Sequence, residues 1–592
     1  MKRWVLLGLL GGAVACSSGS DPDPQGPEEE VCPGTEEVSV PRTGLSQGSA
    51  AALNQDEGER VLITYRSNVS ASALARADVF TAKARQLGAR VQRRFARIDA
   101  VAASVSPAAK AALAADPDVL SVEPDRVVRA LGMSSLPPGF LLAGTPNTHG
   151  SAGEYTDGLK MVRAPQVWDA DGDGNLDVGA PSGSGIRVCV VDSGWDDRHP
   201  ELQAAYVGGK DFIDGDDEPL DQKVTNGVVE WGGGHGTHTA ATIAAQLGAG
   251  GHVRPGDDPD GVAGVAPTVE LLVARVLDTG GNGLTSDVIS ALEWCRENKA
   301  NIVSLSLGSA ERSTAEQTAF QEAFDAGVLS VAATGNQGVL GVSYPAAYSS
   351  VVAVGAVDFG GQWAPFSQYG DEVALVGPGV SVLSATIVGK APYGDVKVAG
   401  ASYVTEPLEF TQIGTYTGKL VYCGLAESVS DCGEGATCEG FVALVDRGNI
   451  YFQDKARNAI RAGAKAVIIG NNDPTDGTGN FTLTDPADYW VPTTSVSMDS
   501  ASLLKQRVGQ DVTIEVAGLD YLRESGTSMA TPHVAGVAAL TWSACPKLTN
   551  AQIRAILQET ASHPGARDQK TGFGVVRADG AVARAKELCQ TP

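Results

Sequence analysis

Two short apolar runs that end in polar residues place the strongest constraint on how this chain can fold. The first, in GIRVCVVDSG, extends from Ile186 to Val191 and ends at Asp192, and the second, in VLSVAATGNQG, ends in a loop that contains Asn336. Continuous apolar runs of this length are typical of strands buried on both faces, as in parallel sheets. Polar residues at the carboxyl ends of such strands face the crevice where open α/β sheets carry out their chemistry, although a lone aspartate there is more often a turn or a cap. The sequence therefore predicts an α/β fold, a parallel sheet with helices on both faces.

Two further segments place a reactive side chain where a helix is expected to begin. In WGGGHGTHTAATIAAQL, glycines precede His235, and in ESGTSMATPHVAGVAAL, Ser528 opens an alanine-rich run. Ser528 could be only a helix N-cap, and the nucleophile pattern G-x-S-x-G is not met because Ala530 occupies its last position. His238 lies one turn beyond His235, but zinc-binding helices need histidines four residues apart with a glutamate between them. We therefore interpret His238 as a packing residue or a support for His235.

Together these segments resemble the motifs of subtilases, the subtilisin-like serine endopeptidases. DSG around Asp192, HGTH around His235 and GTSMATPHVAG around Ser528 occur in the family's order of Asp, His and Ser. The resemblance implies that Ser528 attacks a peptide carbonyl, that His235 transfers the proton, and that Asp192 orients the imidazole. It also implies that the side chain of Asn336 and the backbone N–H of Ser528 form the oxyanion hole. No cofactor is expected for catalysis.

The segment NIVSLSLGS resembles the subtilase strand that pairs with an extended substrate. By that resemblance, six residues would wall the pocket for the substrate side chain that precedes the scissile bond: Ser306, Leu307, Gly308, Ala333, Thr334 and Gly335. None of the six carries a carboxylate, so we expect an apolar or aromatic side chain to be preferred over a basic one. The expected partners are polypeptide substrates.

The charge and the first residues of the chain bear on its partners and location. Its 592 residues include 44 basic and 70 acidic side chains, a formal net charge of -26 that repels phosphate backbones, so no nucleic-acid partner is expected. Residues 1–15 have the basic start and short apolar run of a secretory signal peptide. Cys16 follows directly and resembles the lipid-modified cysteine of bacterial lipoproteins, although Ala13 stands where leucine is usual; simple cleavage beside an ordinary cysteine is the alternative. Either way the predicted location is extracytoplasmic, secreted or lipid-anchored to a bacterial membrane.

Changes in composition and pattern divide the rest of the chain. The predicted parts are a flexible tether at 16–58, a small α+β domain at 59–131, a catalytic domain at 132–390 and 519–592, and a mainly β insert at 391–518. The α+β domain resembles the subtilase propeptide, a folding chaperone that also serves as an intramolecular inhibitor, and self-cleavage would then fall near Leu131 and Gly132. A small binding domain is the alternative.

The insert has a recognisable pattern of its own. Six of its residues match the protease-associated domain: Arg447, Gly448, Phe452, Lys455, Gly463 and Ala464. By that resemblance the insert would influence which proteins enter the cleft. An inert insertion without contact to substrate is the alternative.

The run DADGDGNLD has the spacing of a calcium-binding loop. Oxygen-bearing side chains stand at alternate positions: Asp169, Asp171, Asp173, Asn175 and Asp177. The glutamate expected at the twelfth position is missing, since Ala180 stands there, so a surface turn is the alternative and calcium is a hypothesis for a structural ion. We interpret two other acidic stretches, 211–221 and 256–261, as solvated loops.

Export would permit disulfides among the eight cysteines other than Cys16. Cys189 lies inside an apolar run and is interpreted as simply buried. Cys545 and Cys589 bracket the C-terminal segment and could close it as a loop. Three more cysteines cluster in the insert: Cys423, Cys432 and Cys438.

Two rival functions remain open. The first is a non-catalytic protein that captures polypeptides on a subtilase scaffold, and the second is a metal-dependent hydrolase using His235 and His238. The intact set of Asp192, His235, Asn336 and Ser528 argues against the first. A Ser528→Ala variant that stays unprocessed would distinguish the protease from the binding protein. Inhibition by a serine-directed phosphonate but not by a zinc chelator would exclude the metal-dependent hydrolase.

Overall fold

The computed structural model describes Cys32 and residues 58–66, 73–131, 153–225, 228–231, 233–254, 257–408, 411–474, 477–479, 481, 483 and 490–590. The expected signal peptide, Cys16 and all of the expected tether except Cys32 and Gly58 lie outside these residues. Of the helices within them, none is both long and apolar enough to cross a membrane. The chain divides into two compact units: Cys32 with residues 395–514, and residues 58–394 with 515–590.

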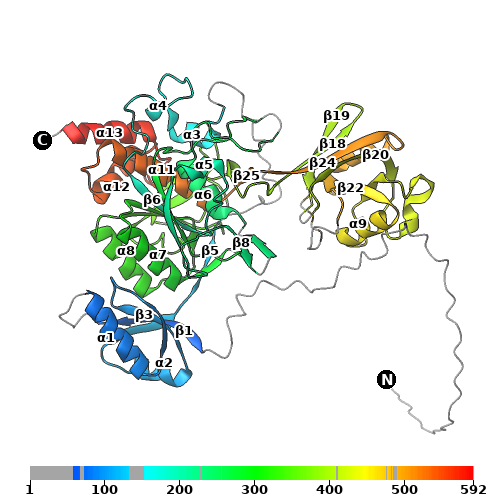
Figure 1. Ribbon diagram of the computed structural model, residues 1–592. Coiled ribbons are helices and arrows are strands. Elements are labelled where there is room, and N and C mark those ends of the chain that lie inside the picture. The colour runs from blue at the N-terminus through cyan, green and yellow to red at the C-terminus, as the bar shows by residue number, and fades with distance from the viewer. Residues whose placement is uncertain are drawn as a thin grey trace, which may run out of the picture. The chain divides into compact units, whose positions relative to one another are not determined.

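A seven-stranded parallel sheet forms the centre of the larger unit (Figure 1), in the order β16-β15-β14-β12-β6-β10-β7. Its strands are β6 (Arg187–Asp192), β7 (Tyr206–Asp211), β10 (Glu270–Arg275), β12 (Ile302–Leu305), β14 (Leu329–Ala333), β15 (Val351–Val357) and β16 (Val373–Pro378). Successive side chains of a strand point to opposite faces. In β6, accordingly, Val188 and Val190 enter one buried cluster, whereas Cys189 and Val191 enter another.

Helices cover both faces of this sheet, as the sequence predicted. The helices of the larger unit on the first face include α6 (His235–Ala244), α11 (Thr527–Ala544), α12 (Asn550–Glu559) and α13 (Ala578–Gln590). The second face is covered by α7 (Thr285–Glu297) and α8 (Thr314–Asp325). Shorter elements complete the rim: α3 (Asp157–Val162), α4 (Pro165–Trp168), α5 (Pro200–Gln203), β8 (Gln222–Thr225), β9 (Val228–Trp231), β17 (Val382–Ala385) and β25 (Tyr521–Glu524).

The small α+β domain, blue in Figure 1, has an antiparallel sheet in the order β2-β3-β1-β4. Its elements are β1 (Glu59–Tyr65), α1 (Ala73–Gln86), β2 (Arg90–Arg94), β3 (Ala100–Val105), α2 (Pro107–Ala114) and β4 (Val119–Pro124). Its own core contains Val61, Phe80 and Leu113. The opposite face of the sheet, through Leu62 and Ala102, shares the buried cluster of α7 and α8.

Two carboxylates of the small domain cap helices that cover the seven-stranded sheet. Asp125 accepts from the backbone N–H of Ser286 at 2.9 Å, and Glu123 accepts from that of Ala315 at 3.1 Å. These donors lie in the first turns of α7 and α8, where backbone N–H groups lack partners within the helix and negative charge is favoured. The small domain is therefore docked by polar contacts as well as by apolar burial.

The smaller unit is built on a closed barrel, in the order β18-β19-β23-β22-β21-β20-β24. Its strands are β18 (Ala391–Val398), β19 (Ala401–Pro407), β20 (Gly414–Tyr422), β21 (Phe441–Asp446), β22 (Ala464–Gly470), β23 (Thr493–Val496) and β24 (Asp511–Leu519). They are accompanied by the 3₁₀ helix η1 (Val429–Gly435) and the helices α9 (Phe452–Arg461) and α10 (Met498–Lys505). The expected mainly β insert is thus confirmed.

Four disulfides join the eight described cysteines. The pairs are Cys32–Cys438, Cys189–Cys295, Cys423–Cys432 and Cys545–Cys589. The last pair closes the C-terminal segment as expected. The interpretation of Cys189 as simply buried was wrong, because its side chain on β6 meets Cys295 on α7 beneath the sheet; a partner 106 residues away leaves no local signal.

Candidate active site

The three residues of the expected triad lie at the ends of secondary-structure elements. Asp192 is the last residue of β6, His235 is the first residue of α6, and Ser528 is the second residue of α11. Close backbone approach between the first two segments requires glycine: a Cβ on Gly236 would lie 2.1 Å from the carbonyl oxygen of Gly194. This approach explains the glycine of HGTH. The glycine of DSG, Gly194, has φ 117°, and a Cβ on it would lie 2.7 Å from the carbonyl oxygen of Pro219.

Asp192 and His235 form a hydrogen-bonded pair. The distance from His235 Nδ1 to Asp192 Oδ1 is 2.7 Å, and Asp192 is fully buried. Asp192 also accepts from the backbone N–H of Ser193 at 2.8 Å and from Thr239 Oγ1 at 3.3 Å. Because an ionised carboxylate only accepts, His235 Nδ1 is the donor. Burial lowers the pKa of His235, but the charge and hydrogen bond of Asp192 outweigh it and raise the pKa to about 9.

Ser528 is turned away from this pair. Its hydroxyl donates to the carbonyl oxygen of Ser306 at 2.9 Å, and Ser306 Oγ donates to the carbonyl oxygen of Ser528 at 2.8 Å. His235 Nε2, the nitrogen that would receive a proton from Ser528, is buried and has no hydrogen-bond partner within the described part of the chain. The Asp–His half of the site is therefore assembled, whereas the serine–imidazole hydrogen bond is not formed.

A short strand of the small domain's tail occupies the neighbouring cleft. This strand, β5 (Val127–Ala130), lies between β11 (Asn282–Leu284) and β13 (Leu307–Gly308) and is antiparallel to both. The next residue, Leu131, donates its backbone N–H to the carbonyl oxygen of Ser306 at 3.1 Å. An extended peptide added to exposed strand edges in this way is a common mode of peptide recognition.

The carbonyl oxygen of Leu131 accepts a hydrogen bond from the side-chain amide of Asn336. The other end of this amide is fixed, because Asn336 Oδ1 accepts from the backbone N–H and the hydroxyl of Thr527, both at 2.9 Å. Thr527 directly precedes Ser528 on the chain. Asn336 therefore presents an oriented N–H donor to a peptide carbonyl beside the serine.

Three of the six expected pocket residues lie beside this peptide: Ser306 accepts from Leu131, and Leu307 and Gly308 pair with β5. All six are buried, and a Cβ on Gly308 would lie 3.1 Å from Leu131 Cδ1. Gly335 has φ 111° and no room for a side chain, since its Cβ would lie 1.9 Å from Gln368 Oε1. Sequence reasoning missed Gln368 and Ser343, which line this region from other loops and share a hydrogen bond of 3.4 Å.

Asp221 was misinterpreted as part of a solvated loop. It is buried, accepts from Ser193 Oγ at 2.6 Å, and accepts from the backbone N–H of Thr237 at 2.9 Å. These donors follow Asp192 and His235 in the chain by one and two residues, so Asp221 braces both segments. Asp211, at the other end of the same stretch, is also buried and pairs with Arg275 at 2.8 Å. The described part of the other stretch, residues 257–261, fits the original interpretation, because Asp258 is partly exposed and Asp260 is exposed.

Two other ionisable residues lie near the pair: Glu524, which had no assigned role in the sequence, and His238, which was interpreted as a packing residue or a support for His235. Glu524, on β25, is buried, its Oε2 has no hydrogen-bond partner in the described residues, and burial raises its pKa. His238 is fully buried, and its Nε2 lies 3.1 Å and 3.2 Å from the carbonyl oxygens of Val382 and Leu522. Burial lowers the pKa of His238 to about 3. His238 is thus a neutral residue directed at backbone carbonyls.

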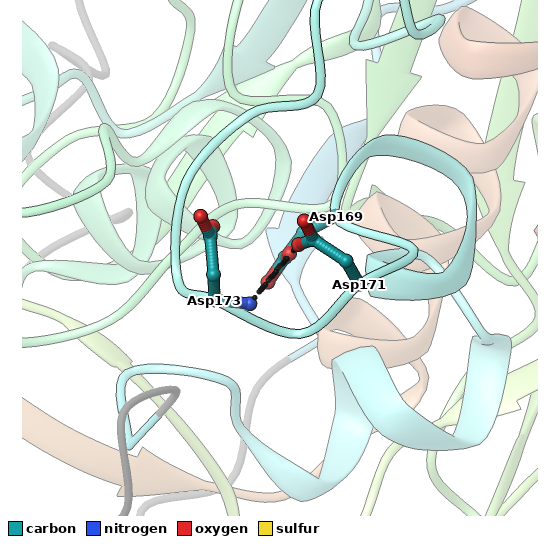
Figure 2. A group of neighbouring side chains, drawn as sticks. All are labelled: Asp169, Asp171 and Asp173. Carbon is teal, nitrogen blue, oxygen red and sulfur yellow. Dashed lines mark hydrogen bonds between the residues drawn. The ribbon is translucent and has the colours of Figure 1, made fainter.

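Three carboxylates of the expected calcium loop lie together (Figure 2). Oxygens of Asp169, Asp171 and Asp173 lie within 4.8 Å of one another. Asp169, however, is already engaged: it accepts from the backbone N–H groups of Gly172, Asp173 and Gly174, and from the hydroxyl of Tyr155 at 2.6 Å.

The last two members of the expected calcium set have other contacts. Asp177 accepts from the backbone N–H of Ala170 at 2.8 Å, and Asn175 donates to Asp173 Oδ1 at 3.2 Å. The carboxylates thus organise the turn through hydrogen bonds of their own. The arrangement contains three of the five expected ligands as a group.

This parallel α/β sheet, with an Asp–His pair at a strand end and a helix-opening serine beside a bound peptide strand, defines a hydrolase of the serine-peptidase class. Residues 183–406 match the Subtilase family and residues 416–504 match the PA domain. The chain is 32% identical over 346 residues to Subtilisin NAT of Bacillus subtilis subsp. natto, a match that covers 57% of this chain and 77% of that protein. The chain belongs to the subtilase family and is a subtilisin-like serine endopeptidase with an inserted protease-associated domain.

The chain is also similar to a second curated protein and to one solved structure. The Thermostable alkaline protease of Halalkalibacterium halodurans is 42% identical over 202 residues, covering 34% of this chain and 50% of that protein. A crystal structure of the psychrophilic subtilisin-like protease Apa1, from the Antarctic psychrotroph Pseudoalteromonas sp. AS-11, matches with 32% sequence identity and a TM-score of 0.47, covering 74% of this chain and 99% of that chain.

Proposed function

We propose that Asp192, His235 and Ser528 act as the catalytic triad, with Asn336 as an oxyanion donor, and that the protein is a zymogen that cleaves itself after Leu131. The observation that carries the proposal is the hydrogen bond from Asn336 to the Leu131 carbonyl. A donor aimed at a peptide carbonyl stabilises the negative charge that appears on its oxygen during attack. The carbonyl beside the proposed nucleophile belongs to the chain itself, at the end of the strand that fills the cleft.

The chemistry follows from the groups around that carbonyl. A rotation about the Cα–Cβ bond of Ser528 would exchange its hydrogen bond with Ser306 for one with His235 Nε2, which has no other partner in the described residues. His235 would then take the hydroxyl proton as Ser528 attacks, and return it to the leaving amine of Gly132. Asp192 stabilises the imidazolium formed between these steps. Water then hydrolyses the acyl-enzyme by the same route.

The peptide in the cleft also supports a substrate preference. Leu131 precedes the proposed scissile bond, and its side chain lies against Gly308. A pocket without a carboxylate offers a basic side chain no partner for its charge. We therefore expect Leu131→Lys to slow self-cleavage, whereas Leu131→Met, which conserves volume and polarity, should be tolerated.

The location of the enzyme stays a prediction. A basic, apolar start followed by Cys16 supports export and a lipid-anchored or secreted product. The mass of the N-terminal peptide would separate a lipid-modified Cys16 from an unmodified one. Regulation of substrate entry by the protease-associated insert likewise stays a prediction.

Mass spectrometry of the reduced wild-type protein beside Ser528→Ala tests the proposed function. We expect the wild type to yield a chain that begins near Gly132, and the variant to remain uncut. Ser543→Ala is the matched control, because Ser543 lies on the same helix and donates only to the carbonyl of Leu540. Cleavage that persists in Ser528→Ala, free of added protease, would overturn the proposal and favour the non-catalytic polypeptide-binding alternative.

A further inference from the structure

The disulfide between Cys32 and Cys438 joins two parts of the chain that lie on opposite sides of the proposed cleavage site. Cys32 precedes Leu131, and Cys438 lies in the insert, far beyond Gly132. The remaining three disulfides each join two cysteines that both follow Gly132. Cys32–Cys438 is therefore the only disulfide of the described residues that spans the cleavage site.

Cys32 is held in the insert by more than its disulfide bond. Cys32 is 7% exposed, and its backbone N–H donates to the carbonyl oxygen of Arg461, at the end of α9, at 3.0 Å. Gly463 leaves the space that the bond needs: a Cβ there would lie 3.1 Å from Cys32 Sγ and 2.5 Å from the carbonyl oxygen of Thr437. The insert thus holds Cys32 by a covalent bond, a backbone hydrogen bond and close packing.

We infer that self-processing produces a two-chain enzyme whose N-terminal fragment stays covalently attached to the insert. The inference rests on the proposed function, which supplies the cut. Hydrolysis consumes one water, leaves a carboxylate on Leu131 and an amine on Gly132, and neither breaks nor reduces the Cys32–Cys438 bond. No oxidant or reductant takes part in the step.

The attachment has two consequences for the mature enzyme. Any group carried by the residues before Cys32, including a lipid on Cys16, stays with the protease after the cut. The inhibitory strand β5 also stays on the same molecule, so its return to the cleft is intramolecular and is not weakened by dilution. Release of the inhibitor then requires either reduction of the bond or a further cut between Cys32 and Leu131.

The test compares the full-length protein in denaturing gels and by intact mass, after alkylation with iodoacetamide to prevent disulfide exchange. Without reductant, we expect the wild type to migrate as one species. Its mass should be that of the chain before self-cleavage plus one water. With reductant, it should separate into an N-terminal fragment and a chain beginning near Gly132. A further cut before Leu131 would leave a shorter N-terminal peptide in the same linkage, which also supports the inference.

Variants locate the bond responsible. In Cys32→Ser/Cys438→Ser, the fragments should separate without reductant, whereas in Cys423→Ser/Cys432→Ser, which removes a disulfide of the same insert, they should stay joined. Fragments of the wild type that separate without reductant would overturn the inference, as would fragments of Cys32→Ser/Cys438→Ser that stay joined. If the reduced wild type is uncut, the proposed function fails instead, so the two failures are distinguishable.

Discussion

The segments 169–177 and 211–221 are both short, acidic and glycine-containing, but their buried carboxylates bind different kinds of partner. Asp169 accepts three backbone hydrogen bonds from its own loop. Asp221 instead accepts from Ser193 and Thr237 on distant elements. Asp211 combines both kinds of partner, since it pairs with Arg275 and also accepts from the backbone N–H groups of its own segment. The Asp169 carboxylate thus mainly organises its own loop, whereas Asp221 connects the residues that follow Asp192 and His235.

The largest expected effect is a loss of stability on removal of the Asp221 carboxylate, which accepts hydrogen bonds from distant residues. Asp221→Ala leaves the hydroxyl of Ser193 and the backbone N–H of Thr237 without an acceptor in a buried place. Each unsatisfied buried group costs about 1–3 kcal/mol, so we expect the free energy of unfolding to fall by about 3 kcal/mol. Guanidinium unfolding of the variant in the Ser528→Ala background, which prevents self-digestion, measures this loss.

Asp217→Ala is the matched control, because Asp217 lies in the same segment but is exposed and pairs only with Lys210 at the surface. Its unfolding midpoint should barely change. If Asp221→Ala and Asp217→Ala lowered the free energy of unfolding equally, the buried contacts of Asp221 would not be the cause of the loss.

The second prediction concerns the charge that buried carboxylates impose on His235. The proposed mechanism needs the neutral imidazole of His235, and the charge of Asp192 raises the pKa of His235 to about 9 against the opposing effect of burial. About one molecule in a hundred would be neutral at pH 7, and this fraction rises with pH to about one half near pH 9 and levels off above it.

The pH dependence of kcat can be measured with the processed enzyme and an internally quenched fluorescent peptide that has the sequence of residues 127–136. The peptide should restore the burial of His235 on binding, and kcat reports the pKa in the complex. We expect kcat to rise with pH, to be half-maximal near pH 9, and to level off above it. A kcat that is already constant from pH 7 upwards would show that the complex holds His235 neutral, against the prediction.

A smaller shift should follow from Glu524→Gln. The Glu524 carboxylate is one of the charges that raise the pKa of His235, after those from Asp192. Glutamine keeps the shape and removes the charge, so the midpoint of the kcat profile should move to lower pH by about 0.5 unit. Asp173→Asn removes a charge from the other acidic segment and should leave the midpoint unchanged. An unmoved midpoint in Glu524→Gln would mean that burial keeps Glu524 protonated over this pH range.

The sequence predicted what local patterns and short motifs specify. Apolar runs identified β6 and β14, and the motifs identified the residues that the fold places at the ends of β6, α6 and α11. The partners of Asp221 and Cys189 could not be predicted, because their contacts lie 16 or more residues away and depend on how the sheet closes. The orientation of the Ser528 hydroxyl toward Ser306 could not be predicted either, because it depends on a carbonyl 222 residues away.

The smallest effect is expected from calcium at the 169–177 loop. The four lone-pair positions of the Asp169 carboxylate are filled by protein donors. A cation would then depend on the exposed Asp171 and Asp173. A site with only two charged ligands is expected to bind calcium with a millimolar dissociation constant, as weak extracellular sites do. About 5 mM calcium should raise the melting temperature by only about 2 °C over a chelator, and Asp171→Asn/Asp173→Asn should abolish the part of the rise that this loop causes.

A rise of about 10 °C that the double variant abolishes would mean that calcium displaces the backbone donors from Asp169 and rebuilds the loop. The two acidic segments would then differ in their ligand, a metal ion in one and protein donors in the other. An identical rise in the wild type and the variant would place the calcium elsewhere and leave the loop as a turn. The physical distinction is whether an oxygen that already accepts two hydrogen bonds exchanges them for an ion.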